Sequence, residues 1–104
     1  MSVQNLAAQA ATITCLAGLA VAHPHLPGAY ITVSQHSPRA LSVQLDSPAA
    51  LEAWREALGV DAGLVVADRI GDRPSLEFEA TVYGVDFRVY AVYTAATASA
   101  GGAA

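Results

Sequence analysis

Between Leu76 and Tyr93 hydrophobic and polar residues alternate, and this pattern predicts two strands folded back on each other at Gly84. The side chains expected to share one buried face are Leu76, Phe78, Ala80, Val82, Val85, Phe87, Val89, Ala91 and Tyr93. Val, Tyr, Phe and Thr are frequent here, as is typical of strands. Gly84 can adopt the positive φ that a tight hairpin turn needs.

A second hairpin is predicted from Tyr30 to Gln35 and from Leu41 to Leu45, joined by a loop at residues 36–39. Its apolar side chains share one face, and the other face is polar, which indicates a sheet covered on one side only. A further strand is expected from Leu64 to Ile70. Its first residues are apolar at successive positions, which predicts a central strand or one covered by both helices.

A helix is predicted to begin at Asp46-Ser47-Pro48, where Asp or Ser is the cap and proline occupies the first helical position. Leu51, Trp54 and Leu58 then fall on one helical face, and Gly59 ends the helix. Because Trp54 lies in the middle of that face, we expect it to be buried against the sheet. Its indole N–H should then bond to a backbone carbonyl.

The segment from Leu6 to Ala22 contains no charged residue. We interpret it as part of an amphipathic helix over residues 3–22. Its expected inner face consists of Val3, Leu6, Ala10, Ile13, Ala17 and Ala20. A signal peptide with residues 10–22 as its apolar region is the alternative, although residues 1–5 lack the positive charge of such a leader. A membrane span is disfavoured, because the run is short and contains Gln9, Thr12 and Thr14.

The elements follow in the order helix, strand, strand, helix, strand, strand, strand. This order predicts one α+β domain over residues 1–93, with an antiparallel sheet of four or five strands and both helices on one face. The alternative is a split sheet, in which the hairpin at residues 30–45 packs apart from the strands at residues 64–93. Residues 94–104 have no large apolar side chain and are predicted to form a disordered tail.

The composition disfavours several functional classes. Of 104 residues 54% are hydrophobic and only 13% charged, against roughly 25% charged in an average globular domain, which suggests that a partner covers some apolar surface. There is no lysine, and the net charge of −4 would repel a phosphate backbone, so nucleic-acid binding is disfavoured. Cys15 is the single cysteine, which agrees with a cytoplasmic location; we expect a buried, inert thiol.

Candidate binding or catalytic residues are few. His23 and His25 flank a proline, but two imidazoles do not make a metal site, so no metal or cofactor is predicted. Glu52 and Glu56 lie four residues apart, and we interpret them as a solvated helix face rather than an acid/base couple. His36 and Arg39 share the loop of the second hairpin. They support the hypothesis of a small-ligand binder or enzyme with a pocket between sheet and helices.

No phosphate-binding glycine loop, nucleophile elbow, Cys-x-x-Cys pair or His-Glu-x-x-His helix is present, and no catalytic residue is assigned. The favoured hypothesis is therefore a non-catalytic interaction protein that acts by binding another protein and is expected to form a homodimer. Tyr83 and Tyr90 are its candidate interaction surface, because both are expected on the exposed face of the 76–93 hairpin.

Two runs carry a resemblance to known proteins: Leu45-Asp46-Ser47-Pro48 through Leu51, Trp54-Arg55 and Leu58-Gly59, and later Tyr83-Gly84-Val85-Asp86-Phe87-Arg88-Val89. With these runs the chain resembles small uncharacterised proteins of high-GC actinobacteria, some carried by phages and integrated elements. The likeness covers residues 29–93. It implies an α+β architecture and a mobile-element setting, with no activity and no catalytic residue to transfer.

Overall fold

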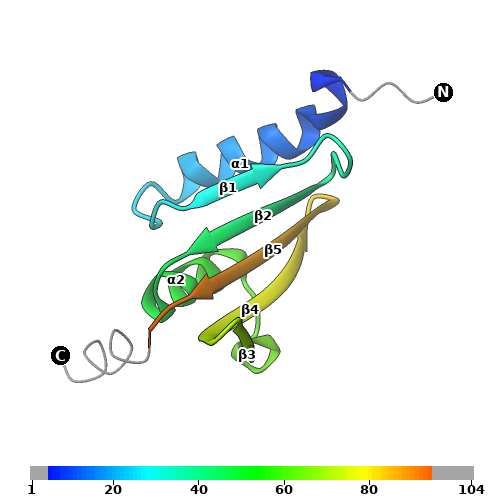
Figure 1. Ribbon diagram of the computed structural model, residues 1–104. Coiled ribbons are helices and arrows are strands. Elements are labelled where there is room, and N and C mark those ends of the chain that lie inside the picture. Colours follow the sequence, from blue (N-terminus) through cyan, green and yellow to red (C-terminus); the bar gives the residue numbers. More distant parts are fainter. Residues whose placement is uncertain (1–4, 95–104) are drawn as a thin grey trace.

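The computed structural model describes residues 5–94, in which one five-stranded sheet carries two α-helices on a single face (Figure 1). The elements are η1 (Leu6–Gln9), α1 (Ala10–Ala22), β1 (Tyr30–Val33), β2 (Ala40–Leu45), α2 (Pro48–Leu58), η2 (Ala62–Leu64), β3 (Val66–Ile70), β4 (Arg73–Val82) and β5 (Val85–Val92). The predicted α+β class and element order are thereby confirmed. Apart from Thr94, the predicted disordered tail lies outside the described residues.

The strand order is β1-β2-β5-β4-β3, so both hairpins belong to one sheet and the split-sheet alternative is wrong. Three of the four strand pairs are antiparallel, but β2 and β5 are parallel, which makes the sheet mixed. The reason is the number of chain reversals between them. Helix α2 brings the chain back after β2, so β3 runs in the direction of β2, and two further reversals give β5 that direction too.

The β4–β5 hairpin has the predicted alternation, and Phe78 lies opposite Val89 on its buried face. Its two-residue turn consists of Tyr83 (φ 51°) and Gly84 (φ 75°). Two successive positive φ values are characteristic of a type I′ turn, which matches the right-handed twist of the flanking strands. The positive φ of Gly84 was predicted. Tyr83 was expected on a strand face, and its place in the turn corrects that expectation.

The β1–β2 hairpin has the predicted register, with Ile31 opposite Val43 and Val33 opposite Leu41. The buried side chains of β2, β4 and β5 meet α2 in one core. The core residues are Leu41, Val43, Leu45, Leu51, Trp54, Phe78, Val85, Phe87, Val89 and Ala91.

Helix α2 begins and ends as predicted. The Ser47 hydroxyl oxygen accepts a hydrogen bond from the Ala50 N–H (3.1 Å), and Gly59 ends the helix in the left-handed conformation with φ 70°. Trp54 is 4% exposed, and its Nε1–H donates to the carbonyl oxygen of Pro27 at 2.8 Å. Both expectations for this side chain are confirmed, and the bond ties α2 to the segment between α1 and β1.

Helix α1 covers the same face of the sheet as α2, but its predicted inner face is wrong. Leu6, Ile13, Ala17 and Ala20 are exposed, whereas Thr12 is buried and Cys15, Leu16 and Leu19 are half-buried toward the core. The other predicted inner residues do not change this result: Ala10 is exposed and Val3 lies outside the described residues. The helix has no charged side that would have to face water. Packing against the sheet therefore determines which side of α1 is buried.

Strand β3 also differs from its prediction, because it is an edge strand and all five of its residues are exposed. The apolar run at Leu64 to Ala67 begins in η2 rather than in the strand. Helix α2 packs over β2, β5 and β4. An edge strand beyond β4 therefore receives no helix cover, and Val66 and Ile70 remain in contact with water.

The burial of Trp54 sets the first prediction. Replacement by alanine should lower the free energy of unfolding by about 3 to 5 kcal/mol, the usual cost of emptying a large aromatic site. Replacement by phenylalanine keeps most of the volume and removes the bond to Pro27, so it should cost clearly less. Urea unfolding followed by circular dichroism measures both. Equal stability of Trp54→Ala and the wild type would contradict the assigned packing.

The turn conformation sets the second prediction. Tyr83 is 91% exposed and has a positive φ that asparagine tolerates better than tyrosine. Because Asn-Gly is the preferred type I′ pair, Tyr83→Asn should raise the free energy of unfolding by about 0.5 to 1 kcal/mol. Tyr83→Ala is the matched control and should not stabilise, since alanine is as strained there as tyrosine. A destabilised Tyr83→Asn variant would refute the turn assignment.

Candidate functional site

The outer side of η1 and α1, from Leu6 to Ala22, forms a surface that we call the α1 ridge. Leu6 and Val21 are 72% and 82% exposed, and Ile13 is also exposed. The other exposed residues of the ridge are Ala7, Ala8, Ala10, Ala11, Thr14, Ala17, Gly18, Ala20 and Ala22. The ridge therefore presents apolar and small side chains to water without a single charge.

Hollows lie along both sides of the α1 ridge. The first hollow, between α1 and α2, has a volume of about 800 Å³. Thr14 and Gly18 line it from α1, Leu58 lines it from α2, and Val82 and Phe87 line it from the sheet. The second hollow, about 420 Å³, lies between α1 and the β1 edge. The ridge is thus a convex strip between two largely apolar concave strips.

Side-chain hydrogen bonds to the sheet and to the β1–β2 loop hold η1 and α1 in place. Gln9 Nε2 donates to the carbonyl oxygen of Val33 (3.0 Å), and the Thr12 hydroxyl donates to that of Pro38. The Cys15 thiol, half-buried rather than fully buried, donates weakly to a carbonyl oxygen of β4 (3.7 Å). Because these bonds act on the inner side of α1, the ridge is preformed.

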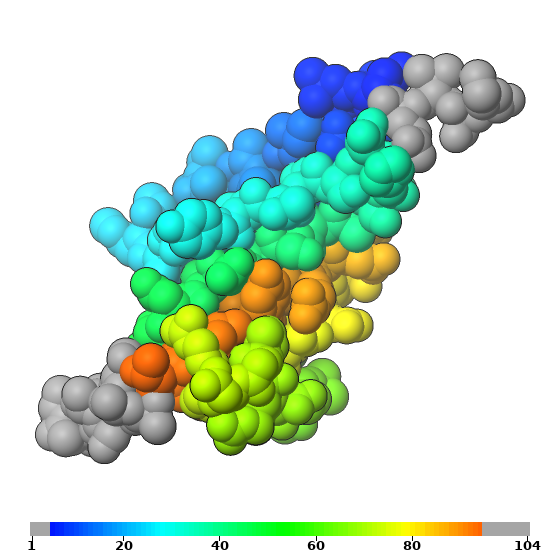
Figure 2. Space-filling model, viewed as in Figure 1, coloured from blue at the N-terminus to red at the C-terminus, as the bar shows by residue number. Residues whose placement is uncertain are grey.

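Within residues 5–94 no helix covers the opposite face of the sheet, and Figure 2 shows its strands reaching the surface. Its polar side chains bond to one another. Arg88 pairs with Glu77 (3.0 Å) and lies 4.5 Å from the centre of the Tyr90 ring, and the Tyr90 hydroxyl donates to Gln44 Oε1 (3.2 Å). The bond to Glu77 raises the pKa of Arg88. These four polar side chains form a network whose members satisfy each other, while Tyr30 and Val66, which lie in the same cross-strand row, are exposed at the two edges of this open face.

The two tyrosines expected to share an interaction surface do not lie together. Tyr90 belongs to the open face, where it is half-buried within the network. Tyr83 lies in the β4–β5 turn and is one of the residues lining the first hollow, on the helix side. The positive φ of Tyr83 takes it out of the strand alternation, so period-two reasoning could not place it.

His36 and Arg39 both lie in the β1–β2 loop, and their role as a ligand site stays a prediction. His36 is exposed, and its backbone N–H donates to the Ser34 hydroxyl (3.1 Å). The Arg39 guanidinium packs closely against Gly84 in the β4–β5 turn. Its Nη2 lies 3.0 Å from the position that a Cβ atom on Gly84 would occupy. Neither residue lines the hollow of about 500 Å³ beside this loop, which lies on the open face.

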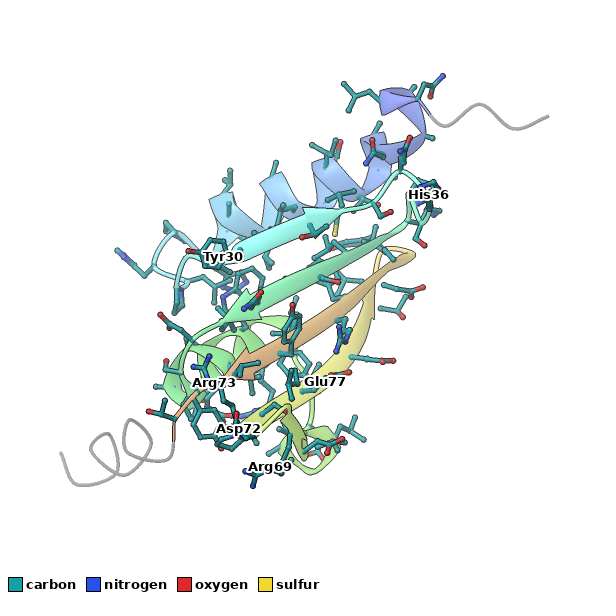
Figure 3. All side chains as sticks on the ribbon, in the orientation of Figure 1. Tyr30, His36, Arg69, Asp72, Arg73 and Glu77 are labelled. Atoms are coloured by element: carbon teal, nitrogen blue, oxygen red, sulfur yellow. The ribbon has the colours of Figure 1, made fainter. Side chains whose placement is uncertain are left out.

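That hollow does not suit an anion either, because Glu79 and Asp86 line it together with the one guanidinium of Arg88. Figure 3 places His36 at the end of the sheet away from Arg69 and Arg73, so these two cations do not join it at that hollow.

Metal and acid/base chemistry receive no support from the other predicted residues. His23 and His25 are exposed, and within residues 5–94 no three His, Cys, Asp or Glu residues are placed to hold a metal ion. Both carboxylate oxygens of Glu52 accept bonds from Arg55. That bonding lowers the pKa of Glu52, which keeps it ionised and unsuited to act as a general acid. In the described part of the chain neither helix is long and apolar enough to cross a membrane.

Comparison with known proteins found no matching family model, curated protein or solved structure. The resemblance to actinobacterial proteins therefore stays a prediction. The α1 ridge was missed by the sequence reasoning, although the charge-free run from Leu6 to Ala22 was the available signal.

The Glu52–Arg55 pair sets the third prediction. Because Arg55 lowers the pKa of Glu52 in the folded chain, the pair stabilises the fold above the ordinary glutamate pKa of about 4.3 and loses this effect as the pH falls below it. NMR titration of the side-chain carboxyl should show the lowered pKa in the wild type. In Arg55→Ala the pKa should return toward its ordinary value, and an unchanged pKa would contradict the assigned cause.

Proposed function

We propose that this chain is a non-catalytic protein that acts by binding another protein through the α1 ridge. The observation that carries the proposal is the charge-free ridge, on which Leu6, Ile13 and Val21 are exposed. Burial of such side chains in an interface gains roughly 25 cal/mol per Å² of apolar area. Contiguous apolar surface of this kind marks interaction sites in folded proteins.

The distribution of polar groups favours binding over catalysis. An enzyme pocket needs polar side chains that converge on a concave surface. Here the first hollow is mostly apolar, and the polar groups of the open face are engaged with each other, as in the Glu77, Arg88, Tyr90 network. A rigid apolar strip without convergent chemistry is a docking surface rather than an active site.

A protein partner is favoured over a lipid surface. Helices that lie on membranes carry Lys or Arg beside their apolar face, and anionic headgroups attract these cations. The segment from Leu6 to Ala22 has neither residue, and the chain has a net charge of −4. A cytoplasmic location and a mobile-element setting belong to the same proposal; the single cysteine and the resemblance over residues 29–93 support them.

A capture experiment with matched variants tests the proposal. The intact chain serves as bait in lysate of its native host, beside Thr14→Arg on the α1 ridge and Thr32→Arg on the open face, both at exposed threonines. Wild type and Thr32→Arg should retain the same partner, and Thr14→Arg should lose it, because a guanidinium would be buried without a counter-charge. Equal retention by all three baits would refute the ridge as the binding surface.

A further inference from the structure

We infer that the partner of the α1 ridge is a second copy of this chain, related by a twofold axis that sets the ridge of each copy into the first hollow of the other. The inference rests on the proposed function and names the partner for the same surface. Three properties of the surface lead to it: its shape, its charge and its size.

The shape of the surface is self-complementary. A twofold interface brings the same patch of both copies together, so each convex element must find a concave element on the same patch. The α1 ridge and the first hollow meet this condition, because Thr14 and Gly18 on one side of α1 also line the hollow. Two antiparallel α1 helices can therefore lie side by side, each filling the space between α1 and α2 of the other copy.

Charge distinguishes this patch from the others. Each copy has a net charge of −4, and a twofold axis brings every charge that lies close to the axis near its own symmetry mate. On the open face this would bring Glu79 and Asp86 toward identical carboxylates. The α1 ridge has no charge from Leu6 to Ala22, so the two ridges bring no like charges of their own together.

The exposed β3 edge is one competing route to a dimer, and its own geometry opposes it. Strand β3 has only five residues, Val66–Ile70. The backbone N–H of Arg69 already donates to the carboxylate of Asp68 (2.8 Å). A second strand could bond to this N–H only by displacing the Asp68 carboxylate from it. Charged groups on a short edge strand are a recognised protection against edge-to-edge pairing.

The size of the surface suits a weak dimer. Helix α1 is about 20 Å long at 1.5 Å per residue, and ridge and hollow together are about two helix diameters wide, again about 20 Å. With η1 and the corrugated surface included, two copies would bury roughly 1,000 Å² in total, the lower limit for a specific interface. The dimer should therefore form with rising concentration rather than persist at all concentrations.

Sedimentation equilibrium from about 1 µM to about 500 µM spans the range expected for an interface of this size. Wild type and Thr32→Arg should change from monomer to dimer across it, whereas Thr14→Arg should remain monomeric, with circular dichroism showing that all three are folded. A wild type that stays monomeric at the highest concentration overturns the inference. If the lysate partner is nonetheless lost in Thr14→Arg, the proposed function survives and the partner is a different protein.

Crosslinking locates the interface without relying on a disruptive variant. In a Cys15→Ser background, Thr14→Cys on the α1 ridge and Thr32→Cys on the open face are treated with a short bis-maleimide. An antiparallel pair of α1 helices sets Thr14 near its symmetry mate, because the residue lies close to the helix midpoint. Thr14→Cys should give a covalent dimer several-fold faster than Thr32→Cys. Equal rates, or a faster reaction of Thr32→Cys, would overturn the inference.

Discussion

The parallel pairing of β2 with β5 is the contact on which the rest of the structure depends. It joins two hairpins that are far apart in the sequence, and it sets Leu41, Val43 and Leu45 beside Phe87, Val89 and Ala91. All six side chains are buried, so β5, the middle strand of the sheet, and its neighbour β2 form one side of the core. An isolated two-stranded hairpin is at best marginally stable in water. The pairing of β2 with β5 stabilises the β1–β2 hairpin by making it part of the larger sheet.

The same pairing determines where the helices lie and what they leave open. To place β5 beside β2, α2 must cross over the strands between β2 and β3, and it covers β5 and β4 on the way. Helix α1 is left to cover the β1 side. Two helices do not fill the width of a five-stranded sheet, and the space between them is the first hollow. The candidate interaction surface thus follows from the topology. No further element within the described residues covers α1 and the first hollow, so any cover must come from elsewhere.

The polar side chains of the two faces of the sheet are bonded in different ways. On the open face, Glu77, Arg88, Tyr90 and Gln44 satisfy each other, so these four polar groups need no partner. On the helix side, α1 bonds inward through Thr12 and Cys15, to backbone carbonyls of the β1–β2 loop and of β4. Its outer side retains only apolar and small groups, whose burial is favourable in any partner of complementary shape.

The sequence by itself determined the elements whose signals are local. Alternation, the Ser47-Pro48 start, the Gly59 end and the Gly84 turn act over a few residues, and the Leu51, Trp54, Leu58 face oriented α2 correctly because the opposite face is charged. Only the tertiary structure decided the rest. The direction of β5 relative to β2 depends on the whole path of the chain. The edge position of β3 depends on how far across the sheet α2 carries the chain. The rotation of α1 about its axis could not be predicted, because α1 has no charged face. The α1 ridge could not be read from the pattern for that last reason: in a helix that is apolar all round, periodicity does not distinguish the side that faces the core from the side that faces a partner.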